Sequence, residues 1–303
     1  MNRILIVGTG ALANLFGSRL TAAGFEVTLL GNWKEGVAAL KEHGIRVVEG
    51  ERVVSYPVKA VSDPSLLDPF RLALVLVKSW QTPRAGEHLA EGLVPEGIAL
   101  SLQNGLGNRE TLARILGRER TAQGVTTTGA TLLGPARVRP GGEGEISIGK
   151  HPRIMPLVEM LQQAGFAVEI VDDVDSLIWR KLLINVGINP LTAILGVTNG
   201  QLVESASALT LMARAVEEVQ GAAAAEGVDL DMSDPLGDVK HVAVNTAGNT
   251  SSMLQDVRRG APTEIDAICG EVCRAAEKHG KAAPVNRALM LLVKSIVELK
   301  GAS

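Results

Sequence analysis

A glycine-rich turn near the start of the chain limits the possible folds more than any other feature of the sequence. The apolar run Ile4–Val7 leads into the glycine turn Gly8–Ala13, and a segment of helical period, Ala11–Ala23, overlaps its end. This order of strand, turn and helix is the dinucleotide-binding fingerprint, here with alanine at the third glycine position. A tight turn and an exposed helix N-terminus suit a pyrophosphate. The residues predicted to hold the dinucleotide are Gly8, Thr9, Gly10, Ala11, Leu12 and Ala13.

The rest of the first half alternates short apolar runs with segments of helical period, which is typical of a parallel sheet covered by helices. The predicted strands are Ile4–Val7, Val27–Leu30, Leu72–Val77, Ile98–Leu102 and Ala122–Thr126. The predicted helices are Ala11–Ala23, Trp80–Glu91 and Asn108–Leu116. Two short extended runs within Thr131–Ile148 are framed by Gly and Pro, and we expect them to form an antiparallel extension at the sheet edge.

After Asp175 no further strand is predicted, and every segment has helical period. The predicted helices are Ile178–Leu195, Ala206–Glu226, Pro235–Ala247, Pro262–His279 and Arg287–Leu299. The 303 residues are enough for two domains. We therefore expect an α/β Rossmann-type dinucleotide-binding domain over residues 1–172 and an all-α domain over residues 173–303.

Charge and hydropathy argue against several kinds of partner. The net charge is −3, with acidic and basic residues interspersed, so no basic stripe is present that would follow a nucleic-acid backbone. No apolar run reaches membrane-spanning length, and the N-terminus has no signal-peptide pattern. The sequence predicts a cytoplasmic protein that binds neither nucleic acid nor membrane. It leaves the oligomeric state open, a homodimer included.

The two cysteines, Cys269 and Cys273, lie four residues apart in a predicted helix. That spacing could begin a metal site, but no nearby histidine or further cysteine completes four ligands. Small buried residues in a reducing compartment are the better interpretation, and we predict no metal.

The end of the second predicted strand bears on cofactor choice. An acidic residue there would hold the ribose 2′-hydroxyl of NAD, but the residues present are Gly31-Asn32-Trp33-Lys34. The missing carboxylate favours the 2′-phosphate of NADP, with Asn32 and Lys34 as its polar neighbours. No arginine is present to decide the matter, so NAD is not excluded, and an ordinary loop with a solvated lysine is the alternative.

The helix predicted at Ile178–Leu195 contains a narrow polar stripe. Lys181, Asn185 and Asn189 follow one another at intervals of four residues, so they share one side of an otherwise apolar helix. Pro190 lacks an amide proton and should kink or loosen the helix near Asn189. A keto acid reductase needs a proton donor for the carbonyl oxygen and polar donors for the carboxylate, which a lysine beside two amides supplies. A lysine whose amine reaches solvent is the alternative.

Several matching segments, in order along the chain, make the sequence resemble the ketopantoate reductases (2-dehydropantoate 2-reductases). The resemblance covers essentially the whole chain. It depends on Gly8–Ala13, Lys78-Ser79-Trp80-Gln81, Gln103-Asn104-Gly105, Trp179-Arg180-Lys181, Asn185, Asn189-Pro190-Leu191-Thr192-Ala193, Asn199-Gly200, Ser251-Ser252-Met253-Leu254-Gln255-Asp256 and Thr263-Glu264-Ile265-Asp266. Many ordered matches are far more specific than any single one.

The resemblance implies a second domain like the C-terminal domain of 6-phosphogluconate dehydrogenase. It also implies catalytic roles for Lys181, as proton donor to the keto oxygen, and for Glu264, as an acid near that lysine and the cofactor. Positions that it assigns to the cofactor, besides Glu264, are Asn32, Lys78, Asn104 and Ala130. Positions that it assigns to the substrate are Asn104, Asn185, Asn189, Asn199 and Ser252. Asn32 stands where the family commonly has arginine, so NADPH selectivity stays in doubt.

The activity that the resemblance implies is NADPH-dependent reduction of ketopantoate to pantoate, in pantothenate and coenzyme A synthesis. Pattern alone gives Glu264 a simpler explanation, as an acid in the first turn of a helix, and it makes Asn199 a turn residue and Ser252 a helix-surface residue. Two other functions stay open. One is a reductase of another branched 2-keto acid, and the other is a regulatory protein that senses dinucleotide without turnover.

Overall fold

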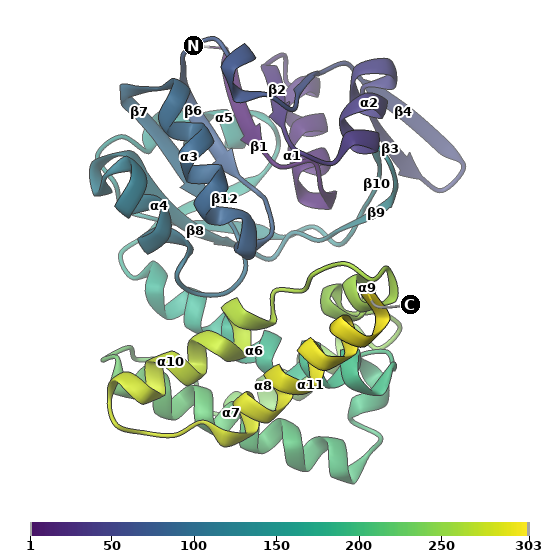
Figure 1. Ribbon diagram of the computed structural model, residues 1–303, viewed down its shortest axis with the longest axis vertical. Helices are drawn as coiled ribbons and strands as arrows, with labels where there is room; N and C mark the ends of the chain where they lie inside the picture. The colour runs from purple at the N-terminus through teal and green to yellow at the C-terminus, as the bar shows by residue number, and fades with distance from the viewer. Residues whose placement is uncertain (1, 302–303) are drawn as a thin grey trace. The chain divides into compact units, whose positions relative to one another are not determined.

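The computed structural model describes residues 2–301. The chain divides into two compact units. Unit 1 comprises the chain up to Gln103 together with Asn108–Val174. Unit 2 comprises Asn104–Gly107 and the chain from Asp175 onward. An α/β unit with a mainly parallel sheet therefore precedes a helical unit, as the sequence predicted (Figure 1).

Unit 1 is built on an eight-stranded sheet with the order β12-β11-β8-β7-β6-β1-β2-β5. All neighbouring strands in it are parallel except β11 and β8. The strands are β1 (Arg3–Val7), β2 (Glu26–Leu30), β5 (Lys59–Val61), β6 (Phe70–Val75), β7 (Leu93–Ser101), β8 (Thr121–Thr126), β11 (Glu145–Gly149) and β12 (Ala167–Val171). The order places β1 between β6 and β2, where the strand order reverses, and ligands of such sheets bind beyond the carboxyl ends of the strands at that point.

Both faces of the sheet are buried, because alternate residues of each strand point to opposite sides. On one side Ile4 and Ile6 join a core that includes helix α1 (Ala11–Ala22), helix α2 (Lys34–His43) and helix α5 (Met155–Gln163). On the other side Leu5 and Val7 pack with helix α3 (Thr82–Gly92) and helix α4 (Asn108–Leu116).

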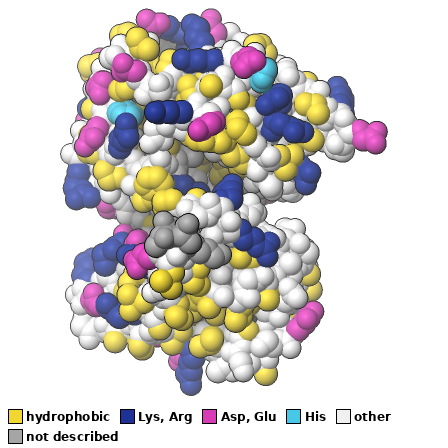
Figure 2. Space-filling model, turned by 45° about the vertical axis from the view of Figure 1, so that its right-hand side comes forward, with side chains coloured by type: hydrophobic (Ala, Val, Ile, Leu, Met, Phe, Trp, Pro, Cys, Tyr) yellow, Lys and Arg dark blue, Asp and Glu magenta, His cyan; other side chains and the backbone are white. Residues whose placement is uncertain are grey.

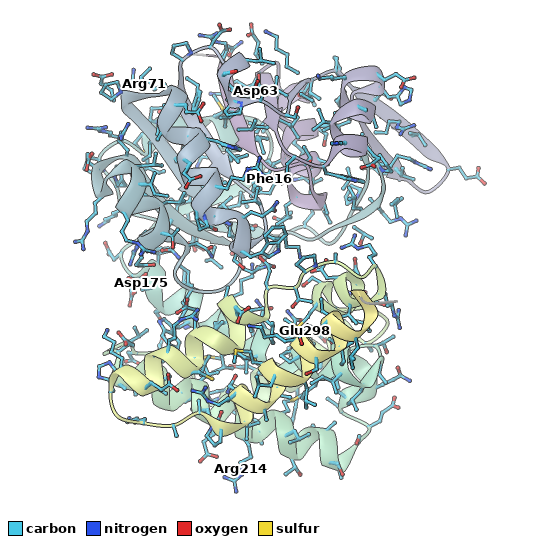
Figure 3. All side chains as sticks on the ribbon, in the orientation of Figure 1. Phe16, Asp63, Arg71, Asp175, Arg214 and Glu298 are labelled. Atoms are coloured by element: carbon cyan, nitrogen blue, oxygen red, sulfur yellow. The ribbon has the colours of Figure 1, made fainter. Side chains whose placement is uncertain are left out.

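Aromatic residues contribute one contact to this core. Phe16 of α1, labelled in Figure 3, stacks on Phe166 with 4.3 Å between ring centroids. The guanidinium of Arg19 lies 4.9 Å from the centroid of the Phe166 ring. This contact joins α1 to the loop before β12.

A second, four-stranded sheet in unit 1 has the order β4-β3-β10-β9. Its strands are β3 (Ile45–Glu49), β4 (Arg52–Tyr56), β9 (Ala130–Gly134) and β10 (Arg137–Pro140). The extension predicted within Thr131–Ile148 is thus correct only for β11, which pairs antiparallel with β8. The hairpin of β9 and β10 instead joins β3 of the second sheet. The prediction was wrong there because β3 and β4 were not recognised as partners.

Unit 2 is helical over the residues described. Its α-helices are α6 (Val174–Leu195, which begins at the last residue of unit 1), α7 (Ala206–Ala225), α8 (Pro235–Asn245), α9 (Ser252–Arg258), α10 (Glu271–Lys278) and α11 (Pro284–Gly301). A π-helical segment at Asp266–Gly270 leads directly into α10. Buried apolar residues from all six helices form one core.

One detail of unit 2 differs from the sequence-based expectations. The helix that was expected to begin at Pro262 begins at Ile265, just after Glu264, and opens with the π-helical segment. Helix α6 continues through Pro190, as the helix predicted over Ile178–Leu195 does.

Charged side chains of both signs are scattered over the face shown in Figure 2, in agreement with the small net charge. Among the helices described, none is long and apolar enough to span a bilayer.

Candidate functional site

The glycine turn of unit 1 has the backbone geometry that its sequence predicts. Gly8 has φ +135°, and a Cβ there would lie 2.9 Å from the carbonyl oxygen of Leu76, so only glycine fits. Gly10 is the N-cap of α1 and has no side-chain cap, and a Cβ at Gly10 would meet no atom within 4 Å. Thr9, Ala11, Leu12 and Ala13 complete the turn and the first residues of α1. Open space beside an uncapped helix N-terminus fits a dinucleotide pyrophosphate.

The side chain of Asn14, a residue not predicted from the sequence, fixes this turn through two hydrogen bonds. Its side-chain nitrogen donates to the carbonyl oxygens of Thr9 (2.9 Å) and Gly10 (2.8 Å). The side chain is fully buried, and its Oδ1 has no partner among the described residues. The two carbonyls are therefore held toward the protein interior, on the side of the buried amide. An asparagine four residues after Gly10, which can bond back to the carbonyl at i−4, was the available signal.

Asn32 lies in the loop after β2, as expected, and its side chain is exposed. Its Oδ1 accepts a hydrogen bond from Gln81 Nε2 at 3.5 Å. This bond leaves the Asn32 amide nitrogen as the group available to donate elsewhere. Lys34 is the first residue of α2 and is also exposed.

Other predicted residues of unit 1 follow the carboxyl ends of parallel strands. Lys78 comes three residues after β6 and is half-buried, and Ala130 begins β9 four residues after β8 ends. Because β1, β6, β7 and β8 are parallel, their carboxyl ends share one edge of the sheet with the glycine turn.

The polar stripe of α6 is present in unit 2. Lys181 and Asn185 are partly buried, and Asn189 is buried with 9% of its surface exposed. Neither asparagine makes a side-chain hydrogen bond within the part of the chain that the structure describes. Burial lowers the pKa of Lys181 to about 8, and the negative charge of Glu264 opposes that shift. An amine with this pKa exchanges protons readily near neutral pH.

Glu264 and Asn104 lie together in unit 2. Glu264 is buried, and its Oε2 accepts a hydrogen bond from Asn104 Nδ2 at 3.3 Å. The segment that carries Asn104 is fixed by a hydrogen bond from the Leu106 amide to the carbonyl of Ala267 in the π-helical segment. Gly105 has φ +79°, and a Cβ there would come within 2.3 Å of the same carbonyl oxygen. π-Helical turns are frequent at functional sites.

Asn199 and Ser252 occupy different settings in the same unit. Asn199 is buried and donates from Nδ2 to Thr246 Oγ1 at 2.9 Å, while its Oδ1 has no partner among the described residues. Ser252 is exposed at the first residue of α9. The adjacent Ser251 caps α9 and accepts a hydrogen bond from Thr192 of α6 at 2.7 Å. The structure thus joins the start of α9 to α6, but shows no contact of Asn199 or Ser252 with Lys181.

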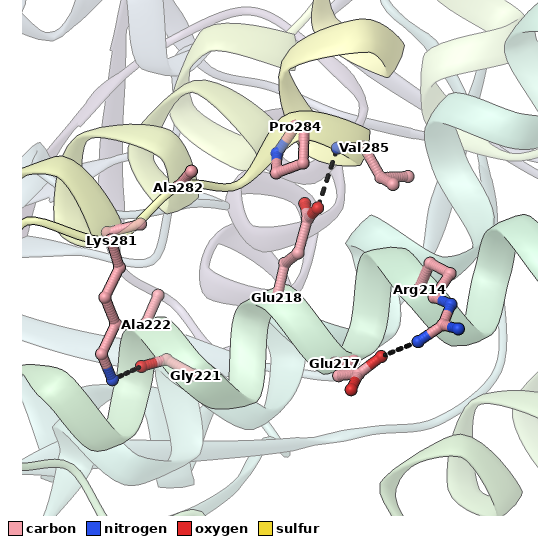
Figure 4. A pocket seen from close by; sticks show the side chains of 10 residues that line it. Arg214, Glu217, Glu218, Gly221, Ala222, Lys281, Ala282, Pro284 and Val285 are labelled. Carbon is pink, nitrogen blue, oxygen red and sulfur yellow. Dashed lines mark hydrogen bonds and ion pairs between the residues drawn. The ribbon is translucent and has the colours of Figure 1, made fainter.

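A separate concavity of about 480 Å³ lies between α7, α10 and the start of α11 (Figure 4). Its lining includes Arg214, Glu218 and Lys281, and none of the predicted site residues. Glu218 is committed to a structural role there, since it accepts hydrogen bonds from the backbone nitrogens of Val285 and Asn286, each at 2.8 Å.

These features define a class: an oxidoreductase that combines a dinucleotide-binding α/β unit with a helical unit carrying a partly buried lysine of lowered pKa. Comparison with known proteins defines the family. The family described as "Ketopantoate reductase PanE/ApbA" matches residues 4–153, and "Ketopantoate reductase PanE/ApbA C terminal" matches residues 173–297. The chain belongs to the ketopantoate reductase family.

Similar proteins span the full length of the chain. A 2-dehydropantoate 2-reductase of Halobacterium salinarum is 37% identical over 300 residues, covering 96% of this chain and 98% of that protein. The Archaeoglobus fulgidus protein of the same name is 36% identical, covering 98% of each.

Two solved structures are also similar. A PanE/ApbA family ketopantoate reductase from Ralstonia eutropha has a TM-score of 0.92 and 32% identity, covering 99% of both chains. D-mandelate dehydrogenase, solved with NADH and anilino(oxo)acetate, has a TM-score of 0.92 and 27% identity, covering 98% of both chains. A nicotinamide dinucleotide is the cofactor that these relationships support.

Proposed function

We propose that this protein reduces the keto group of 2-dehydropantoate to the hydroxyl of pantoate, with NADPH as the preferred cofactor. The observation that carries the proposal is the partly buried lysine of α6: burial lowers the pKa of Lys181 to about 8, the charge of Glu264 opposes that shift, and Lys181 lies in line with Asn185 and Asn189. Full-length similarity to proteins named 2-dehydropantoate 2-reductase supports the choice of substrate.

The two units have different tasks in this proposal. The dinucleotide-binding domain, which we assign to residues 1–172, binds the dinucleotide through the glycine turn Gly8–Ala13, with Lys78 and Ala130 at the same sheet edge. When bound, the reduced nicotinamide supplies a hydride to the keto carbon. The helical domain, which we assign to residues 173–303, holds the substrate and supplies the proton.

Lys181 is the proton donor. As the keto carbon is reduced, its oxygen gains negative charge and needs a proton. The protonated Nζ of Lys181 donates a hydrogen bond to that oxygen and then transfers its proton. A pKa of about 8 leaves the amine mostly protonated at neutral pH, and a lower pKa makes it a stronger acid than an ordinary lysine.

Glu264 keeps this lysine charged, since a nearby carboxylate favours the protonated amine. Asn104 holds the carboxylate in place and stabilises its negative charge through their hydrogen bond. In our assignment both residues also contact the cofactor, and Asn104 contacts the substrate.

Asn185 and Asn189 bind the polar groups of the substrate. Their amides lie one and two turns along α6 from Lys181, and no other side chain of the described residues bonds to them. Asn199 and Ser252 complete the substrate positions in our assignment. The buried, unpartnered Oδ1 of Asn199 is an acceptor suited to a substrate hydroxyl.

NADPH is favoured over NADH because the loop Gly31–Lys34 directly after β2 carries no carboxylate to repel a 2′-phosphate, and Lys34 adds a positive charge there. We also assign the protein to the cytoplasm. Its two free, buried cysteines agree with a reducing compartment.

The test is NADPH oxidation, followed by absorbance, with 2-dehydropantoate, 2-ketoisovalerate and phenylglyoxylate as alternative substrates. We expect the highest kcat/KM for 2-dehydropantoate. The aromatic acid tests a second candidate function, suggested by the structural similarity to D-mandelate dehydrogenase. A higher kcat/KM for either of the other acids would show that acid to be the preferred substrate. NADPH binding without turnover of any acid would indicate a dinucleotide-sensing protein.

A further inference from the structure

Gln103 links four segments of unit 1 through one polar network. Its Nε2 donates to the carbonyl oxygen of Val77 at 3.0 Å and to Thr82 Oγ1 at 2.8 Å. Its Oε1 accepts a hydrogen bond from Ser101 Oγ at 3.0 Å. Thr82 in turn donates to Asn108 Oδ1 at 2.8 Å. The network therefore joins the ends of β6 and β7 to the first residues of α3 and α4.

Gln103 itself is half-buried, but three of its network partners are buried. Ser101, Thr82 and Asn108 have 1%, 1% and 3% of their surface exposed. Nε2 of Gln103 faces two acceptors, and its Oε1 faces the hydroxyl of Ser101, which donates. These partners leave one orientation for the amide. Buried networks in which the polar groups are satisfied hold their members rigidly.

This network ends beside the glycine turn. The Leu76 amide donates to the Val7 carbonyl at 2.9 Å, and a Cβ on Gly8 would lie 3.3 Å from the nitrogen of Val77. The segment that leads to Lys78 thus packs directly against the dinucleotide turn. Gln103 holds the carbonyl just before Lys78, and the Gln81 amide holds the carbonyl of Lys78 itself at 2.8 Å.

From this arrangement we infer that Gln103 is a positioning residue for the cofactor. It fixes the backbone on the N-terminal side of Lys78, and so aims that cation at a dinucleotide bound on the glycine turn. The inference deepens the proposed function and rests on its dinucleotide site, but it does not depend on which keto acid is reduced. Positively charged groups held rigidly beside a phosphate bind it without the cost of ordering a flexible side chain.

The test measures the Kd for NADPH by fluorescence, with thermal unfolding of each variant recorded in parallel. Gln103→Leu removes the whole amide. Gln103→Glu has nearly the same shape and keeps an acceptor for Ser101, but its carboxylate cannot donate to Val77. Thr82→Val removes only the hydroxyl that links Gln103 to Asn108. Gln123→Leu, at a buried glutamine of the neighbouring strand β8, is the matched control.

We expect both Gln103 variants to raise the Kd roughly tenfold, the effect of losing a pair of partly buried hydrogen bonds. Thr82→Val should have a smaller effect in the same direction, and Gln123→Leu should stay within about twofold of the native Kd. If Gln103→Leu fails to fold, the Kd of the isosteric Gln103→Glu variant tests the inference. Native affinity in the Gln103 variant that folds, or an equal loss of affinity in Gln123→Leu, would overturn the inference.

A double-mutant cycle distinguishes positioning from general loosening of the unit. In a Lys78→Met background, Gln103→Leu should change the Kd by less than about twofold, because residues that act through one another are not additive. An undiminished tenfold effect in that background would refute the route through Lys78. A native protein that binds NADPH but reduces no keto acid would disprove the proposed function while leaving this test intact, whereas absence of NADPH binding would disprove both.

Discussion

The side-chain nitrogen of Asn104 lies 3.3 Å from Oε2 of Glu264, although the two residues are 160 positions apart in the chain. Glu264 in turn acts through its charge on Lys181. Three residues from distant parts of the sequence thus act on one another in series. The Asn104 amide orients the Glu264 carboxylate, and that carboxylate raises the pKa of the Lys181 amine, which burial lowers. In the proposed function this series controls proton delivery, and the first predictions test it.

The first prediction concerns the proton donor. Lys181→Ala should lower kcat by ~10²–10⁴-fold, the usual contribution of a positioned general acid. The Kd for NADPH should change much less, because the dinucleotide turn lies in unit 1. Steady-state kinetics and fluorescence titration measure the two effects. Lys240→Ala, a lysine of α8 outside the proposed site, is the control, and near-native turnover of Lys181→Ala would remove Lys181 from the mechanism.

The second prediction concerns pH dependence. The protonated form of Lys181 is the active one, so kcat/KM should fall as the pH rises through about 8. The charge of Glu264 raises this pKa, and Glu264→Gln should therefore move the falling limb to lower pH. Profiles from pH 6 to 10 measure the shift. Glu277→Gln, an exposed acid of α10, should leave the limb in place, and a shift to higher pH in Glu264→Gln would contradict the assigned interaction.

A third prediction concerns the amide stripe. Asn185→Ala or Asn189→Ala should each reduce kcat/KM by an amount equivalent to ~1–3 kcal/mol, the usual cost of leaving a buried polar partner unpaired. Thermal stability should be nearly unchanged, because neither side chain bonds to the described protein. Asn286→Ala should instead lower thermal stability and leave kcat/KM nearly native, since Asn286 is fully buried and donates to the Ala215 carbonyl at 3.0 Å. Loss of stability with native kinetics at Asn185 and Asn189 would make them structural amides.

A fourth prediction concerns the stability of unit 2. Glu218 accepts the backbone amides of Val285 and Asn286 and the side-chain amide of the latter at 2.9 Å, so it caps α11 from α7 (Figure 4). Glu218→Ala should lower the free energy of unfolding by ~2–3 kcal/mol, because several donors lose a charged acceptor. Denaturant titration measures this change. Glu217→Ala, which breaks only an exposed ion pair with Arg214, should cost less than ~1 kcal/mol, and kcat should be native in both.

The fold was largely predictable because its strongest signals are local. The prediction of Asn108–Leu116 coincides with α4, and the strand at Ile4–Val7 differs from β1 by one residue. Four strands of unit 1 were missed: β3, β4, β5 and β12. They are three to five residues long, and three of them lie at an edge of their sheets, so their burial patterns are weak.

The site was predictable only in part. The stripe Lys181, Asn185 and Asn189 follows from helical spacing, because its members share one helix. The pairing of Asn104 with Glu264 depends on how a four-residue segment between β7 and α4 packs against the π-helical turn, which no local pattern reveals. The sequence indicated Gln103 only as part of a motif. Its hydrogen bonds join it to Val77 and Thr82, which are more than 20 residues away in the chain, so no local pattern predicts them.

The last prediction concerns cofactor choice, where the sequence departs from its family at Asn32. The loop Gly31–Lys34 after β2 has no carboxylate to repel a 2′-phosphate, and the exposed Lys34 partly neutralises one. The amide of Asn32, held by Gln81 at 3.5 Å, offers a single neutral donor group, which is weaker than a bidentate guanidinium. NADPH should therefore be preferred over NADH by a modest margin, and Asn32→Arg should widen that margin.

The wider margin should come from a lower KM for NADPH at nearly constant kcat, because the 2′-phosphate is remote from the reacting carbon and binds alike in the ground and transition states. Kinetics with both cofactors on the native protein and the variant measure this. Lys34→Ala provides the complementary arm and should narrow the margin. If the native protein prefers NADH, Asn32 serves the ribose hydroxyl instead, and the assignment of NADPH is wrong.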